Sequence, residues 1–243
     1  MTGLSVVIDC FPESVRHYKE GYAVIAIDVI RATTTAVTAV AAGRRCFPAS
    51  SIEMALPIAA RLDHPLLVGE LGGNMPYGFD MNNSPAEIIS RTDILRPMIL
   101  VSSSGTQLIH NTKDCDAGYI SCFRNYGSTI KHLVDRHRHI AVIGAGTRGE
   151  FREEDQMCCA WIADGLMKAG YKPEDKRTIE VMDKWRDSPV EACITGKSAE
   201  YLRKSGQVKD LEFILHHVND IDSAFMIKHD EIVRIPVSEK INE

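Results

Sequence analysis

Short apolar runs alternate with helix-like segments along most of the chain, and this alternation limits the fold more than any other feature of the sequence. The expected strands lie at residues 5–8, 22–27, 65–68, 98–101, 118–121 and 140–143. The expected helices lie at residues 32–42, 52–61, 85–91, 106–111, 126–136 and 153–168. Alternation of this kind is typical of βα units around a largely parallel sheet. We therefore predict an α/β fold with three layers, α/β/α, and a largely parallel or mixed sheet.

The last third of the chain, from about residue 171, is more charged and more helical than the rest. Helices are expected at residues 189–202 and 208–218, and closing strands at 224–228 and 231–236. A length of 243 residues suits one large α/β domain or two intimately packed halves. We treat residues 1–243 as a single domain and keep a subdomain at 171–243 as the alternative.

Composition excludes several classes of protein. No apolar run approaches the roughly 18 residues of a membrane-spanning helix, and the N-terminus becomes polar too early for a signal peptide. The net charge of −5 argues against nucleic-acid or acidic-membrane partners. Seven cysteines without a Cys-x-x-Cys pair favour reduced, mostly buried thiols over a disulfide framework or a zinc site. We expect a cytoplasmic protein, with a homo-oligomer left open.

The strongest functional signal is the segment Asp-Val-Ile-Arg-Ala-Thr-Thr-Thr that begins at Asp28. It stands where an apolar strand becomes an Ala-rich helix, so Asp28 is expected at the carboxyl end of a strand. Free N–H groups at the helix start favour an anion, Arg31 can hold two phosphate oxygens, and Asp28 can hold a cation beside them. Helix capping would explain Thr33 and Thr34 but not the adjoining Asp28 and Arg31. The segment predicts a phosphate site, with Thr33 and Thr34 among the residues that contact the substrate.

Two further groups of polar residues follow the strand expected at 65–68. Glu70 comes directly after it, and a loop rich in Gly, Pro and Asn then leads into a helix. Ser84 is a plausible helix cap, but capping leaves Glu70, Asp80 and Asn83 unexplained. Ligands collect at the carboxyl edge of open α/β sheets. We therefore expect Glu70 and Asp80 to contact metal or substrate, and Asn83 and Ser84 to contact substrate.

The next two strand ends also supply groups that suit an anion. Residues 102–106 read Ser-Ser-Ser-Gly-Thr, which places hydroxyls and exposed N–H groups at a second helix start. Its candidate substrate contacts are Ser104, Gly105 and Thr106. Arg124 and Asn125 follow the strand at 118–121, bring another guanidinium to the same edge and are further candidate substrate contacts. A Ser-rich turn alone is a weak signal, but its place at a strand end strengthens it.

Residues 144–149 form a G-x-G-x-x-G sequence after a strand, so a dinucleotide site is one interpretation. The context argues against it, because four acidic residues follow at once and would repel phosphates at that helix start. We instead predict that Arg148 of this loop contacts an anion and that Glu154 or Asp155 contacts a cation. A phosphatase of the haloacid dehalogenase type is also disfavoured, because its Asp-x-Asp pattern would need an acid where Ile30 stands.

Taken in order, the blocks at residues 28–34, 69–70, 78–85, 102–106 and 145–155 resemble the 2-phosphosulfolactate phosphatase family. The likeness runs from about residue 23 to 160 and continues more loosely through 210–213 and 233–236. One departure is Ser104, which replaces an Asn in the turn that usually reads Thr-Thr-Asn-Gly-Thr. The resemblance implies an α/β fold and a magnesium-dependent phosphatase that releases phosphate and 3-sulfolactate on the route to coenzyme M.

Within that resemblance, Mg²⁺ would act as a Lewis acid and template for phosphoryl transfer. Its candidate ligands are Asp28, Glu70, Asp80 and Asp155, and the candidate catalytic residues are Asp28, Arg31 and Asp155. Arg31 would clamp the phosphoryl group, with Arg124 or Arg148 on the carboxylate or sulfonate of a small anionic phosphomonoester. Whether an Asp forms a phosphoenzyme or activates water stays open.

Two alternatives to this function remain. One is a phosphatase for another 2-phospho-hydroxyacid, such as phospholactate or phosphoglycerate. The other is a non-catalytic anion-binding or regulatory protein that uses the same helix starts without turnover. Release of phosphate separates the second alternative from both enzymes.

Overall fold

One mixed β-sheet runs through the part of the chain that this computed structural model describes, residues 3–236. Its strands are β1 Ser5–Cys10, β2 Tyr22–Ile27, β3 Cys46–Ala49, β4 Leu66–Gly69, β5 Met98–Val101, β6 Ala117–Ser121, β7 His139–Gly144, β8 Lys172–Pro173, β9 Ser223–Lys228 and β10 Glu231–Pro236. They are ordered β4-β5-β3-β10-β9-β6-β2-β7-β1-β8. Every pairing is parallel except the three made by β9 and β10. The predicted α/β class and largely parallel sheet are confirmed.

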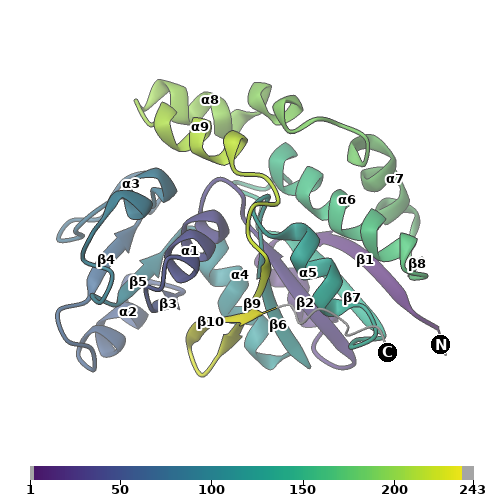
Figure 1. The fold of residues 1–243 in the computed structure, drawn as a ribbon, viewed down its shortest axis with the longest axis horizontal. Coiled ribbons are helices and arrows are strands. Elements are labelled where there is room, and N and C mark those ends of the chain that lie inside the picture. Colours follow the sequence, from purple (N-terminus) through teal and green to yellow (C-terminus); the bar gives the residue numbers. More distant parts are fainter. Residues whose placement is uncertain (1–2, 237–243) are drawn as a thin grey trace.

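Helices cover both faces of this sheet (Figure 1). They are α1 Ala32–Ala41, α2 Ile52–Ala59, α3 Pro85–Ser90, α4 Gly105–Asn111, α5 Tyr126–Leu133, α6 Glu153–Lys168, α7 Lys176–Trp185, α8 Lys197–Lys204 and α9 Val208–His216. Side chains of β2 alternate between two cores, as the two-residue period of a strand requires. Val24 and Ala26 pack with α1, α3 and α4, whereas Ile25 and Ile27 pack with α5 and α6. The sheet is therefore the middle of three layers.

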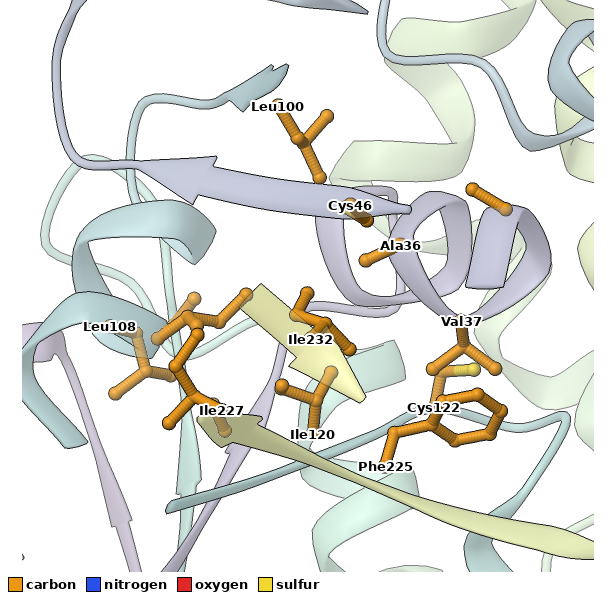
Figure 2. Close-up of a cluster of buried hydrophobic side chains, with 14 of the residues drawn as sticks. Ala36, Val37, Cys46, Leu100, Leu108, Ile120, Cys122, Phe225, Ile227 and Ile232 are labelled. Carbon is orange, nitrogen blue, oxygen red and sulfur yellow. The ribbon is translucent and has the colours of Figure 1, made fainter. Parts of the chain in front are cut away.

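The β9–β10 hairpin completes the middle of the sheet. β10 pairs with β3 at Ile232 and Cys46, and β9 pairs with β6 at Phe225 and Ile120. Figure 2 shows Phe225 and Ile232 in one buried cluster with Ile120 and with Val37 of α1. Strands from the last third of the chain are thus built into the same sheet as those from the first two thirds.

The segment from α7 to α9 arches over the top of the view in Figure 1, above α1, α3 and α6. α7 starts at a side-chain cap, because the Asp175 carboxylate accepts a hydrogen bond from the Thr178 N–H. A 3₁₀ turn at Val190–Thr195 and then α8 and α9 follow. This places α8 and α9 across the carboxyl ends of the strands, where the predicted site residues converge.

Apart from differences of up to three residues in the bounds of other elements, the structure differs from the sequence predictions at four places. β3 was missed because Pro48 argues against a strand interior, and the two-residue β8 is too short to leave a pattern. α7 was not predicted as a separate helix, and the helix predicted at 189–202 is a 3₁₀ turn followed by α8. No helix within residues 3–236 has both the length and the apolar character needed to cross a bilayer.

Candidate active site

A cavity of about 480 Å³ opens at the carboxyl ends of β2, β4, β5 and β7, under α8. Its lining residues are Asp28, Ile30, Arg31, Glu70, Gly72, Gly73, Asn83, Ser103, Ser104, Thr147, Arg148, Arg152, Lys197, Ser198, Glu200, Tyr201, Leu202 and Lys204. Six of the predicted site residues therefore line one cavity: Asp28, Arg31, Glu70, Asn83, Ser104 and Arg148. The convergence of strand ends that the sequence implied thus brings charges of both signs to one place.

Asp28 follows the last residue of β2 and is 9% exposed. Thr33 fixes its backbone, since the Thr33 hydroxyl donates to the Asp28 carbonyl at 2.8 Å and accepts from the Asp28 N–H at 3.0 Å. The Ala32 N–H donates to the Asp28 carboxylate at 3.2 Å. Burial raises the pKa of Asp28 to about 7; the hydrogen bond from Ala32 opposes this rise, and the carboxylates of Glu70 and Glu154 add to it. A neighbouring cation would relieve this unfavourable burial of negative charge.

Gly105 begins α4 against the Asp28 side chain. A β-carbon built on Gly105 would lie 2.1 Å from Oδ2 of Asp28 and 2.6 Å from the β-carbon of Ala32. Both distances are far inside van der Waals contact, so only glycine lets the turn at residues 102–106 approach the Asp28 carboxylate this closely.

We expect Gly105→Ala to lower activity by about 100-fold, because its methyl group must displace the Asp28 carboxylate. Overpacking at this buried contact should also destabilise the protein by about 1–3 kcal/mol. Steady-state kinetics together with thermal unfolding would measure both effects. Gly3→Ala is the matched control, since a β-carbon at Gly3 meets nothing within 4 Å. Kinetics of Gly105→Ala equal to those of Gly3→Ala would contradict this role.

Arg31 also lines the cavity and is 5% exposed. Its Nη1 donates to Oδ2 of Asp210 at 2.5 Å, and its Nη2 donates to Oδ1 of Asn82 at 3.2 Å. A guanidinium has five N–H groups in a planar fork, so these two bonds leave donors for an anion. Arg31 is therefore a permanently charged group held in a buried site by its own counter-charge.

Glu70 ties two cavity-lining segments together. Its Oε1 accepts from the Ser103 N–H at 2.8 Å, and its Oε2 accepts from the Gly73 N–H at 2.7 Å and from the Ser103 hydroxyl at 3.0 Å. The Ser103 hydroxyl in turn accepts from the Gly72 N–H at 2.7 Å. Glu70 thus joins the loop after β4 to the turn after β5 while facing the cavity.

Two more carboxylates lie buried near Asp28, at the start of α6, behind the cavity-lining residues and not among them. Asp155 is 3% exposed and accepts from the Val29 N–H at 2.8 Å. Burial, then the Glu154 and Asp28 carboxylates, raise the pKa of Asp155 well above its usual range. Burial also raises the pKa of Glu154, whose Oε2 has no hydrogen-bond partner in the part of the chain that the structure describes. This crowding of buried acids would favour a bound cation.

The acids do not form a complete metal cage. Within residues 3–236, no group of three or more His, Cys, Asp or Glu side chains is arranged to hold a metal ion. Mg²⁺ does not require such a cage, because it usually keeps several waters and binds one or two carboxylates together with substrate phosphate. The unpartnered Oε2 of Glu154 and the buried Asp28 carboxylate are donors of the hard-oxygen type that Mg²⁺ prefers.

Positive charge gathers on the β7–α6 side of the cavity. Arg148, Arg152 and Lys197 all line it. Glu150 accepts from Nη1 of Arg152 at 2.7 Å and also pairs with the Lys197 ammonium group. The Nε of Arg152 is buried without a hydrogen-bond partner among the described residues. Arg148, Arg152 and Lys197 thus offer guanidinium and ammonium donors that can receive an anion on this side of the cavity.

Two of the predicted polar contacts, Asn83 and Ser104, line the cavity with side-chain groups that the fold does not use. Asn83 is 1% exposed and its Oδ1 has no hydrogen-bond partner within the described residues, so it can accept from a ligand or hold a metal-bound water. Ser104 precedes α4 and makes no side-chain cap there. Both are therefore free to serve what occupies the cavity.

Three predicted hydroxyls instead hold the surrounding backbone. Thr33 bonds to the backbone of Asp28, and the Thr34 hydroxyl donates to the Val29 carbonyl at 2.7 Å. Ser84 caps α3 by accepting from a backbone N–H at 3.1 Å, and its hydroxyl donates to the carboxylate of a residue on α9 at 2.5 Å. We assign these hydroxyls to loop geometry rather than to direct contact with substrate.

The structure places Asp80 and Arg124 away from the cavity. Asp80 forms an ion pair with Arg96 at 2.9 Å and accepts from a backbone N–H of β4. Arg124 donates to both carboxylate oxygens of Asp220, at 3.0 and 2.6 Å, and to the Thr38 hydroxyl at 2.9 Å. Each side chain is occupied by partners distant in sequence, so we do not retain Asp80 as a metal ligand or Arg124 as a substrate contact.

Asn125 and Thr106 are likewise used inside the protein. The amide of Asn125 is fully buried and accepts from the Cys122 N–H at 3.0 Å while donating to the Thr129 hydroxyl at 3.0 Å. Thr106 and Ser102 bond each other reciprocally through side chain and backbone, each at 2.9 Å. These residues build the turns that shape the site and do not line the cavity.

Several residues that line or brace the cavity were missed from the sequence. They are Gly73, Ser103, Arg152, Lys197, Tyr201 and Asp210. Tyr201 crosses the cavity and donates to the Gly73 carbonyl at 2.5 Å. Lys197, Tyr201 and Asp210 belong to charged helical stretches, where nothing in the local pattern distinguishes a site residue from a solvated one. The signal that could have found Ser103, Arg152 and Asp210 is the family resemblance, since all three lie within the stretches that carry it.

Comparison with known proteins finds relatives over most of the chain. A family model described as 2-phosphosulpholactate phosphatase matches residues 9–228. A protein of Pseudothermotoga lettingae, named "Probable 2-phosphosulfolactate phosphatase", is 34% identical over 155 residues, 63% of each chain. Proteins with the same name from Carboxydothermus hydrogenoformans and Clostridium perfringens strain 13 are 28% and 26% identical, over 84% and 91% of this chain and 85% and 92% of theirs. The first of these alignments thus spans less than two thirds of that relative.

Proposed function

Because the chain belongs to the 2-phosphosulfolactate phosphatase family, we propose that it is a phosphatase that hydrolyses 2-phospho-3-sulfolactate to 3-sulfolactate and phosphate, with Mg²⁺ as cofactor. The observation that carries the proposal is a single cavity that joins the buried Asp28 carboxylate and the part-buried Glu70 carboxylate to a buried arginine. Asp28 and Arg31 are three residues apart at the same strand end and both line that cavity. Phosphoryl transfer depends mostly on positioning and charge neutralisation, which this pair of charges supplies.

We assign the metal to the acidic part of the cavity. Asp28 would hold Mg²⁺, with Glu70, Asp155 and the unpartnered Glu154 carboxylate as direct or water-mediated ligands. The burial of Asp28 and the nearby Glu70 and Glu154 carboxylates, which together raise the pKa of Asp28, support this assignment. When bound, Mg²⁺ polarises a phosphoryl oxygen and neutralises its charge. The residues of the chain hold the ion, orient the ester and exclude water.

Arg31 would clamp the transferring phosphoryl group, and the cations on the β7–α6 side would receive the rest of the substrate. Arg148, Arg152 and Lys197 offer guanidinium and ammonium donors for the carboxylate and the sulfonate. This arrangement favours a substrate with several anionic groups over a simple alkyl phosphate. It also supplies the local positive charge that a protein of net charge −5 needs for a polyanionic substrate.

A phosphate-release screen tests the function. The purified protein is incubated with 2-phospho-3-sulfolactate, 2-phospholactate and 2-phosphoglycerate, with added Mg²⁺ or with EDTA. We expect the highest kcat/KM for 2-phospho-3-sulfolactate and loss of turnover with EDTA, restored by excess Mg²⁺. A higher kcat/KM for one of the other two acids would favour the alternative phosphatase. Release of phosphate from none of the three acids would favour the alternative that the protein binds anions without catalysis.

A further inference from the structure

Asp210 is a buried carboxylate on α9 that contacts the cavity wall at two places. It is 3% exposed, and its Oδ2 accepts from Nη1 of Arg31. Its Oδ1 accepts from the Ser84 hydroxyl at 2.5 Å and from the Ala86 N–H at 3.1 Å. Both oxygens are thus engaged. The carboxylate joins the start of α1 to the start of α3, although Asp210 lies 179 residues from Arg31 in the sequence.

The Arg31–Asp210 ion pair fixes the direction of the guanidinium. Both side chains are 4% exposed, so solvent does not compete for either charge. The guanidinium is planar, and its two terminal nitrogens are held separately, Nη1 by Asp210 and Nη2 by Asn82. Two bonds to different terminal nitrogens define the plane of the group. The N–H donors that remain are therefore directed before any ligand arrives.

α9 braces the same guanidinium by a second route. Its N-terminal neighbour Gln207 accepts from Nδ2 of Asn82 at 3.2 Å, which orients the Asn82 oxygen toward Arg31. The same oxygen accepts from the Asn83 N–H at 2.7 Å, next to the unpartnered Asn83 amide in the cavity. Residues at the start of α9 thus set the position of Arg31 and of the 82–84 loop together.

We propose that Asp210 is the positioning residue for Arg31, holding its guanidinium in the plane from which it binds the phosphoryl group. Asp210 touches no substrate itself and acts through Arg31. The inference rests on the proposed phosphatase function and adds a residue from the C-terminal helices to its machinery. Preorganised charge of this kind contributes most when the protein, not the ligand, has already oriented it.

The test is a double-mutant cycle between Arg31→Ala and Asp210→Asn, read in kcat and KM for 2-phospho-3-sulfolactate. Asp210→Asn keeps the shape of the side chain but removes its charge, and misorientation of Arg31 should lower kcat/KM by about 100-fold. If Asp210 acts through Arg31, the double variant should be no slower than Arg31→Ala alone. Losses that multiply would overturn the proposal.

The matched control is Asp220→Asn. Asp220 also pairs with a buried arginine, Arg124, and lies in the same C-terminal region but outside the cavity. Its variant should lose stability while keeping the kcat and KM of the remaining folded protein. Equal kinetic losses in Asp210→Asn and Asp220→Asn would show a merely structural role.

A second variant, Asp210→Glu, retains the charge and moves it by one methylene group. It should therefore stay folded and still lose kcat. Wild-type kcat in that folded variant would also overturn the proposal.

Binding of inorganic phosphate separates failure of this inference from failure of the proposed function. Calorimetric titration with phosphate needs no turnover, so it applies even if none of the esters is a substrate. We expect Asp210→Asn and Arg31→Ala to weaken phosphate binding by a similar factor, and Asp220→Asn to leave it unchanged. Wild-type phosphate affinity in Asp210→Asn, with reduced affinity in Arg31→Ala, would refute the positioning role.

Discussion

Arg31→Ala is expected to lower kcat/KM by about two to three orders of magnitude, the usual loss when one preorganised charge-stabilising donor is removed. Arg31 is the buried guanidinium of the cavity and is held at its Nη1 and Nη2 by Asp210 and Asn82. Steady-state phosphate release measures the loss. Arg31→Lys keeps the charge but not the planar fork, so its activity should lie between those of the wild type and Arg31→Ala.

The substitution also leaves Asp210 as an unpaired buried charge, which typically destabilises a protein by about 3–5 kcal/mol. Kinetics must therefore be expressed per folded molecule, with the folded fraction taken from thermal unfolding. Arg44→Ala provides the comparison, because Arg44 is 2% exposed and pairs with Asp93 away from the cavity. Should Arg31→Ala retain the kcat/KM of Arg44→Ala, the clamp role of Arg31 would be excluded.

Asp28→Asn is expected to reduce Mg²⁺-dependent turnover by about three orders of magnitude or more, the rate equivalent of roughly 4 kcal/mol. The amide keeps the size of the carboxylate and can still accept from the Ala32 N–H. It removes the charge that would hold the metal. Because a neutral amide is cheaper to bury than a carboxylate, the metal-free variant should unfold at or above the wild-type temperature.

Phosphate release over a Mg²⁺ titration, together with thermal unfolding in EDTA, checks both parts of this expectation. The control is Asp93→Asn, which removes a carboxylate that pairs with Arg44 and Arg91 outside the cavity. Its Mg²⁺ dependence should match that of the wild type. An Asp28→Asn variant that is folded, active and still inhibited by EDTA would show that residues other than Asp28 hold the metal.

The part of the site that could be predicted from sequence is the part that local pattern controls. The apolar run of β2, the Ala-rich α1 and the polar residues between them stand together in the chain, and the structure gives β2 the predicted bounds. Asp28 and Arg31 follow from that junction. Because parallel strands end at one edge, Glu70, Asn83 and Ser104 could be placed near them without knowing any contact.

The rest of the candidate site could not be predicted, because its side chains pair with residues that are not their neighbours in the sequence. Arg124 stands at a strand end like the others, but Asp220 occupies its guanidinium from 96 residues away. Asp80 is likewise bound by Arg96. Asp210 and Lys197 lie in charged helices whose local pattern is that of a solvated surface, and only the tertiary fold brings them to the cavity. No periodicity in the chain encodes such pairings.

The central position of the β9–β10 hairpin imposes an order on biosynthesis. Within residues 3–236, the strand groups β4-β5-β3 and β6-β2-β7-β1-β8 join edge to edge only through that hairpin. Glu70 and Ser103 follow strands of the first group, whereas Asp28 and Arg148 follow strands of the second. A nascent chain on the ribosome therefore cannot bring its two half-sites into final register until β10 has left the exit tunnel.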